Sequence, residues 1–113
     1  MIIIQKKQQT PFNSVFLVIR GGHKVLIDID LRVFLSKFNW YLKKSAHSVY
    51  VWTRRIHNGK YHHVSMHRLI LQAPPGLKVH HINHNTLDNR RENLSLITER
   101  EHRHFDDWHI FER

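Results

Sequence analysis

Histidines and asparagines that could carry out chemistry are concentrated in the last third of the chain. His80 and His81 are adjacent, Asn93 lies twelve residues after His81, and His102 lies nine residues after Asn93. Neutral imidazole has an ordinary pKa of about 6.5, so it can take a proton from water at neutral pH, and it also binds metal ions. Because the chain has no cysteine, any metal site must use His, Asp, Glu or Asn.

The elements that must position these residues are predicted from local patterns. Two β-prone runs enclose a polar loop, and the three segments cover residues 79–82, 83–92 and 93–97. Thr98 and Glu101 have the spacing of a capping box, which predicts a helix that begins at Glu99 and carries His102 about one turn in. The expected order is strand, loop, strand and helix.

The first half of the chain has the pattern of an antiparallel sheet. Gly21-Gly22 and Asn58-Gly59 are turn signals between β-prone runs, and a short helix capped by Asp30 is expected after the first hairpin. The predicted strands cover residues 15–20, 24–29, 40–43, 48–56 and 60–65.

A Pro-Pro-Gly break at 74–76 separates the two halves of what its length predicts to be one domain. We expect an α+β fold. The chain is expected to form a single domain, residues 1–113, with two subregions. Residues 1–73 would form a basic antiparallel sheet with a short helix, and residues 74–113 would form the unit of strand, loop, strand and helix.

The charge distribution favours a polyanionic partner. Lys and Arg number 18 against 9 Asp and Glu, and no acidic residue occurs from Leu31 to Leu87. The alternative is a solvated basic surface that serves only solubility. The basic residues predicted to contact DNA are Lys43, Lys44, Arg54, Arg55, Arg68, Arg90 and Arg91.

Side chains alternate along the strand predicted around residue 52. Tyr50, Trp52 and Arg54 share one face, and Val51 and Thr53 share the other. Aromatic strand residues are usually packed, so the aromatic face is expected to be core, although aromatics interleaved with Arg can also stack on bases. The segment 66–71 is predicted to be a short apolar helix or turn, and its His67 and Arg68 could contact DNA. The alternative is that His67 is partly buried and bonded to backbone.

The motifs M-H-R-L-I at 66–70, V-H-H-I-N-x-N-x-x-D-N-R-R-x-N-L at 79–94 and T-x-x-x-H at 98–102 together resemble the HNH endonucleases. The aromatic strand and the Asn-Gly hairpin upstream are similar to the small phage and intron-associated homing type. The resemblance covers about residues 15–104. It implies a ββα-metal nuclease that hydrolyses phosphodiester bonds in double-stranded DNA, by nicking or double-strand cleavage.

The resemblance also implies roles for particular residues. His81 would be the general base, and Asn93 would bond backbone near His81 and fix the orientation of its imidazole. His80 and His102 would hold one divalent cation, with Mn²⁺ or Mg²⁺ supporting activity. Many relatives have Asp and Asn at those two positions, and the two histidines here make Zn²⁺, Ni²⁺ or Co²⁺ possible as well. His84, where the family often has Gly, is expected to be structural.

Two other functions explain less of the sequence. A non-catalytic nucleic-acid-binding module with a structural metal would need four protein ligands, and a small basic ribosome-associated or chaperoning protein leaves the His81, Asn93 and His102 spacing unexplained. The apolar triplet at the start is too short for a signal peptide, and no run of about 18 apolar residues occurs. We expect a cytoplasmic protein of a bacterial or phage-infected cell, with no membrane or small-molecule partner. The DNA target and the oligomeric state are left open.

Overall fold

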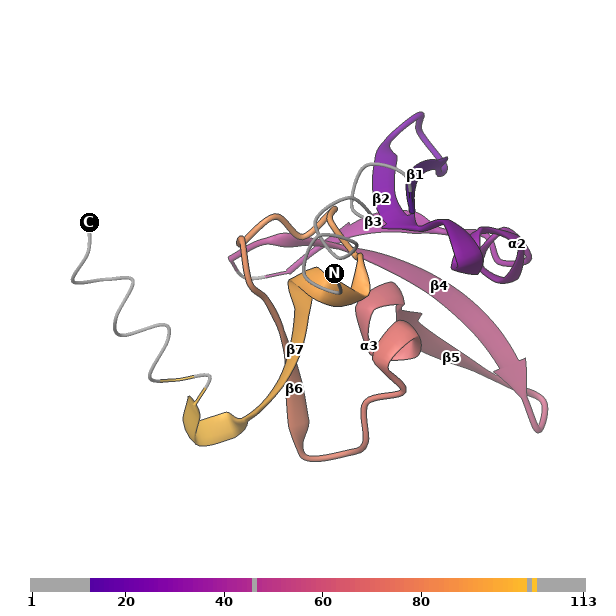
Figure 1. The fold of residues 1–113 in the computed structure, drawn as a ribbon. Coiled ribbons are helices and arrows are strands. Elements are labelled where there is room, and N and C mark those ends of the chain that lie inside the picture. The colour runs from indigo at the N-terminus through magenta and orange to yellow at the C-terminus, as the bar shows by residue number, and fades with distance from the viewer. Residues whose placement is uncertain (1–12, 46, 102, 104–113) are drawn as a thin grey trace.

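The computed structural model describes residues 13–45, 47–101 and 103, and it is a small α+β structure made mostly of strands (Figure 1). In the first half, the elements are β1 (Ser14–Val18), β2 (Lys24–Asp28), the 3-10 helix η1 (Ile29–Leu31), α2 (Arg32–Leu35), β3 (Tyr41–Lys44), β4 (Val49–His57), β5 (Lys60–Ser65) and α3 (Met66–Leu71). They are followed by β6 (Leu77–His81), the 3-10 helix η2 (Arg91–Asn93) and β7 (Leu94–Thr98). Among the described residues, no helix is long and apolar enough to cross a membrane.

The strands form three antiparallel sheets of orders β1-β2, β3-β4-β5 and β6-β7. The strands predicted in the first half are confirmed to within one or two residues, but the prediction of one sheet there is wrong. The short helices and the Trp40 segment lie between β2 and β3 along the chain, and the indole Nε1 of Trp40 donates to the Leu35 carbonyl at 2.7 Å. This packing leaves the first hairpin as a separate sheet.

The turns follow local backbone rules. Asn58 and Gly59 have φ values of 53° and 76°, which are the positive values that a two-residue hairpin turn requires. The capping box is confirmed, because Thr98 Oγ1 accepts from the Glu101 N–H at 3.1 Å and Glu101 Oε1 accepts from the Thr98 N–H at 2.8 Å. The predicted cap at Asp30 is wrong, since η1 has Asp28 as its N-cap residue and Asp30 binds an arginine instead.

The core lies between the β1–β2 hairpin, α2, β4 and α3. Its fully buried side chains are Val25, Ile27, Leu35, Val51 and Met66. The prediction that the aromatic face of β4 is core is wrong: Val51 and Thr53 are buried, whereas Tyr50 and Trp52 are half-buried and Arg54 is exposed. Thr53 is held there because its Oγ1 donates to the Asn39 carbonyl at 2.7 Å.

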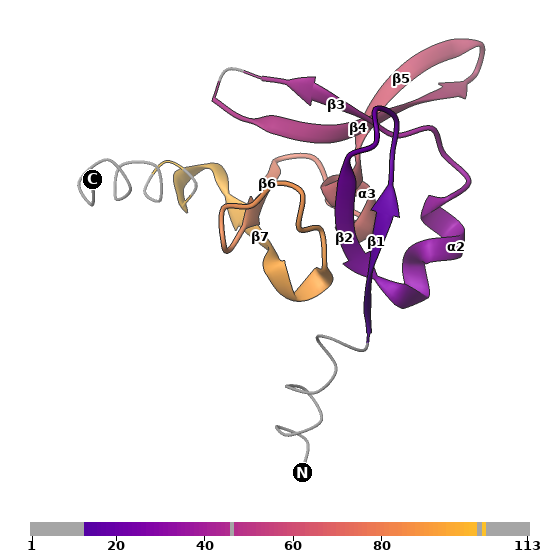
Figure 2. The same cartoon turned by 90° about the horizontal axis from the view of Figure 1, so that it is seen from above.

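The loop between β6 and β7 is fastened to the first hairpin. Leu26 donates its backbone N–H to the Leu87 carbonyl, and its own carbonyl accepts from the Asn89 N–H, both at 2.8 Å. Figure 2 shows this loop beside β2, and Figure 1 shows α3 between the β6–β7 and β4–β5 hairpins. These contacts hold the histidine-rich segment against the rest of the molecule.

Candidate functional site

His81 is the last residue of β6, and its side chain is buried with 5% of its surface exposed. Its Nε2 lies 2.7 Å from Oδ1 of Asn89. A carboxamide oxygen can only accept a hydrogen bond, so Nε2 carries the ring proton in the neutral imidazole. The lone pair then lies on Nδ1, which is the nitrogen that can take a proton from a water molecule.

Asn89 holds the imidazole of His81, a contact that the sequence did not predict. The resemblance implied that Asn93 fixes the orientation of His81, and that Asn89 braces the loop together with Asn83, Asn85 and Asp88. Instead Asn89 is fully buried and makes the direct bond to the imidazole, while its backbone is tied to β2. The motif contains Asn89, but only the folded loop shows which of its asparagines reaches the ring.

Two aromatic side chains from the first half pack near the imidazole of His81. The ring centroid of His67, on α3, lies 5.0 Å from that of His81, and the Tyr50 ring, on β4, lies 6.1 Å away. The burial of His67 agrees with the second of its two expected roles, but its Nδ1 has no hydrogen-bond partner among the described residues, so the bond to backbone expected with it is not found at that atom. Nothing in the spacing of His67 and His81 indicated this contact.

Burial lowers the pKa of His81 below 6.5, and it outweighs the hydrogen bond that the ring donates to Asn89 and the charge of Asp88, which both raise the pKa. The imidazole is therefore neutral at neutral pH, as a general base must be. Because the pKa is lowered, this form persists to more acidic pH than it does for an exposed histidine.

His67 makes folding stability depend on pH. Burial lowers its pKa from 6.5 to about 3, with smaller contributions from His81 and Arg68. The unfolded chain therefore binds a proton at His67 more tightly than the folded chain, and stability present above pH 6.5 is lost as the pH falls toward 3. From about pH 7 to about pH 5, this group should lower the free energy of unfolding by about 2 kcal/mol.

Urea denaturation at the two pH values measures that loss. In His67→Phe, which keeps an aromatic ring but cannot titrate, the pH dependence should be smaller than in the wild type by the same ~2 kcal/mol. An equal pH dependence in both proteins would show that His67 is not the group responsible.

Asn93 holds the loop rather than the ring of His81. Its Oδ1 accepts from the backbone N–H of Asn83 at 2.9 Å, and its Nδ2 donates to the Asp88 carbonyl at 2.8 Å and to Asn83 Oδ1 at 2.9 Å. Asn83 and Asn85 in turn accept from the backbone N–H groups two residues ahead. Asn93 thus binds backbone near His81, as predicted, and fixes the imidazole only through the loop that carries Asn89.

Three arginines predicted to contact DNA form hydrogen bonds or ion pairs with other groups of the protein. Arg68 donates to the carbonyls of Leu77 and Pro74 at 2.7 and 3.0 Å and so braces the turn before β6. Arg90 pairs with Asp88 and Glu92 at 2.7 Å, and Arg91 pairs with Asp28 and Asp30 at 3.5 and 3.1 Å. These contacts give the three side chains structural roles, because each guanidinium group is bonded to other groups of the protein. Their contact with DNA stays a prediction.

The other four basic residues predicted to contact DNA are exposed on the three-stranded sheet. Lys43 lies over the Trp52 ring at 5.5 Å and Arg54 over the Tyr61 ring at 4.9 Å. Lys44 and Arg55 are on the opposite face, since neighbours along a strand alternate. The four residues therefore do not form one surface.

His80, the first predicted metal ligand, lies beside a second imidazole, that of His84. Their ring centroids are 5.4 Å apart in an edge-to-face arrangement, and β6 ends one residue after His80. Within the described residues, no group of three His, Cys, Asp or Glu side chains could hold a metal ion. The second predicted ligand, His102, lies outside the described residues.

The part of the chain that contains His81 matches a known protein family. Residues 65–104 match the model of a family described as HNH endonuclease. The match covers α3, the β6–β7 hairpin and its loop, which include His67, His81, Asn89 and Asn93. Neither the curated proteins nor the solved structures gave a match to this chain.

Proposed function

Since the segment from residue 65 to residue 104 belongs to the HNH endonuclease family, we propose that this protein is a metal-dependent endonuclease that hydrolyses phosphodiester bonds in DNA. The observation that carries the proposal is the state of His81, which is buried, neutral and oriented by Asn89 so that Nδ1 bears the lone pair. A side chain in this state is suited to the removal of a proton from an attacking water.

The reaction is a hydrolysis in which His81 moves the proton. Nδ1 of His81 takes a proton from water, the water oxygen bonds to phosphorus, and the bond from phosphorus to a bridging oxygen breaks. The leaving oxygen keeps the electron pair of that bond and takes a proton from solvent. Oδ1 of Asn89 accepts the hydrogen bond from the Nε2–H group throughout, and it therefore stabilises the imidazolium that forms. The loop held by Asn93 and Asp88 keeps Asn89 in place.

The ring centroids of His80 and His84 are 5.4 Å apart, and each imidazole has a nitrogen of the kind that coordinates a divalent cation. His80 would hold it together with His102, and His84 lies beside His80. The cation would supply stabilisation of the negative charge on the leaving oxygen. We propose Mn²⁺ or Mg²⁺ as the functional ion, with Zn²⁺, Ni²⁺ or Co²⁺ also able to bind imidazole ligands.

A supercoiled plasmid incubated with the protein and a series of divalent ions tests this function. We expect nicked circles with Mn²⁺ or Mg²⁺ because one site cuts one strand at a time, and no cleavage in excess chelator. Cleavage that persists unchanged in chelator would remove the metal from the mechanism. Binding of plasmid and metal without any cleavage would instead identify a non-catalytic nucleic-acid-binding module.

A further inference from the structure

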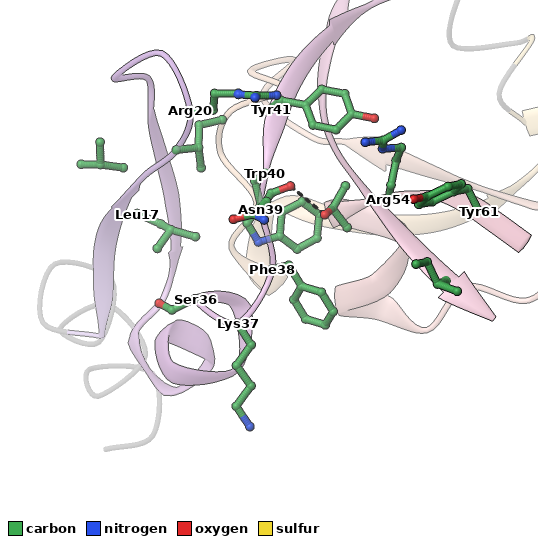
Figure 3. A pocket seen from close by; sticks show the side chains of 14 residues that line it. Leu17, Arg20, Ser36, Lys37, Phe38, Asn39, Trp40, Tyr41, Arg54 and Tyr61 are labelled. Atoms are coloured by element: carbon green, nitrogen blue, oxygen red, sulfur yellow. Dashed lines mark hydrogen bonds between the residues drawn. The ribbon is translucent and has the colours of Figure 1, made fainter. Parts of the chain in front are cut away.

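A cleft of about 790 Å³ lies apart from His81, between the β1–β2 hairpin, the segment 36–41 and the outer half of β4 (Figure 3). β3 pairs with β4 only as far as Trp52, so the strand edge beyond Trp52 has no β3 residue opposite it. The residues of that edge, Thr53, Arg54 and Ile56, line the cleft. None of the residues that pack against His81 is among its described lining residues.

The cleft is basic and aromatic. Arg20, Lys37 and Arg54 line it, and none of its described lining residues is acidic. Figure 3 shows Arg54 beside Tyr61, and its guanidinium lies 4.9 Å from the centroid of that ring. Tyr41 also lines the cleft, and it contacts His63 through its hydroxyl group at 3.2 Å. A cation beside an aromatic ring can bind the phosphate of a nucleotide while the ring stacks on the base of the same nucleotide.

Apolar side chains at this cleft are exposed to solvent to an unusual extent. Tyr61 is 63% exposed, Ile56 66% and Val18 62%. In a duplex the bases are stacked and paired, so their faces are not available to such side chains, whereas an unpaired base presents its face. Resting on the endonuclease function proposed above, we propose that this cleft binds unpaired nucleotides of the DNA substrate, with phosphates at Arg20, Lys37 and Arg54 and a base against Tyr61.

The cleft and His81 are joined by one face of the three-stranded sheet. Residues directly opposite in an antiparallel pair share a face, and Tyr41 is opposite Trp52 as Lys43 is opposite Tyr50. This face continues to Arg54, four residues beyond Tyr50, or about 13 Å along β4. Tyr50 lies near His81, with 6.1 Å between the ring centroids. A strand of a duplex rises about 3.4 Å per nucleotide and covers that length in about four nucleotides. An unpaired strand can be more extended and needs fewer, so the cleft would hold DNA near the scissile bond.

Binding to labelled single-stranded oligothymidylate and to a duplex of the same length, measured by fluorescence anisotropy in chelator, tests the proposal. For Tyr61→Ala we expect affinity for the single strand to fall about fivefold or more, the effect of losing one stacked base, and affinity for the duplex to change little. Tyr61→Phe keeps the ring and should bind as the wild type does. Arg54→Ala should weaken binding to both, because it removes a phosphate contact.

Matched controls lie outside the cleft. Phe16→Ala removes another exposed aromatic side chain, and Lys60→Ala removes a charge next to Tyr61 along β5. Both should keep the preference of the wild type between single strand and duplex. Single-strand affinity unchanged in Tyr61→Ala, or an equal loss for both DNA forms, would overturn the proposal. Because binding in chelator needs no turnover, failure of the plasmid assay would refute the endonuclease function without deciding this result.

Discussion

Replacing His81 by alanine should slow plasmid cleavage by about 10²- to 10⁴-fold, which is the usual contribution of a positioned general base. Affinity for DNA should change little, because a general base acts on the attacking water and contributes little to ground-state binding. Single-turnover cleavage at saturating DNA measures the rate, and a binding titration in chelator measures the affinity.

His62→Ala is the matched control, because His62 is exposed on β5 and distant in sequence from the loop that holds His81. It should cleave at the wild-type rate. His80→Ala and His102→Ala should instead weaken metal binding, which calorimetry with Mn²⁺ measures. If His81→Ala lost the metal and His80→Ala kept it, the proposed roles of the two neighbours would be exchanged.

Replacing Asp88 by alanine should lower the free energy of unfolding by about 3 kcal/mol, the cost of breaking a buried ion pair from one side. Asp88 is buried, and two of its contacts to Arg90 are 2.7 and 2.8 Å long. Burial raises the pKa of Asp88, but hydrogen bonds from Arg90 and Asn83 outweigh it and leave the pKa below 3.8. The ionised carboxylate therefore stabilises the fold at neutral pH, and its loss leaves Arg90 partly unpaired.

Urea denaturation followed by tryptophan fluorescence measures this effect, because Trp40 is buried in the core. Asp30→Ala is the matched control. It also removes an aspartate paired with an arginine of the same loop, but the two side chains are 64% and 47% exposed, so a loss of about 1 kcal/mol or less is expected. Equal losses in both variants would show that burial of the Asp88 pair contributes no additional stability.

Features set by neighbouring residues were predictable from the sequence. The Asn58-Gly59 turn requires positive φ values that these two residue types tolerate, and the Thr98 capping box joins groups only three residues apart. The spacing of His81 and Asn93 identified the segment that the family match also covers. Each of these signals is short-range, and its physics is complete within a few residues or one motif.

The tertiary structure decided which contacts each side chain makes. The sequence contained Asn89, Tyr50 and His67, but their places near His81 depend on how α3, β4 and the loop pack, and they come from segments up to 39 residues apart. Likewise, the sequence shows Arg90 and Arg91 only as charges in a basic chain, and folding places carboxylates beside them. Charge and aromaticity are properties of a residue, whereas burial, pairing and the protonation state of an imidazole are set by neighbours that only the folded chain supplies.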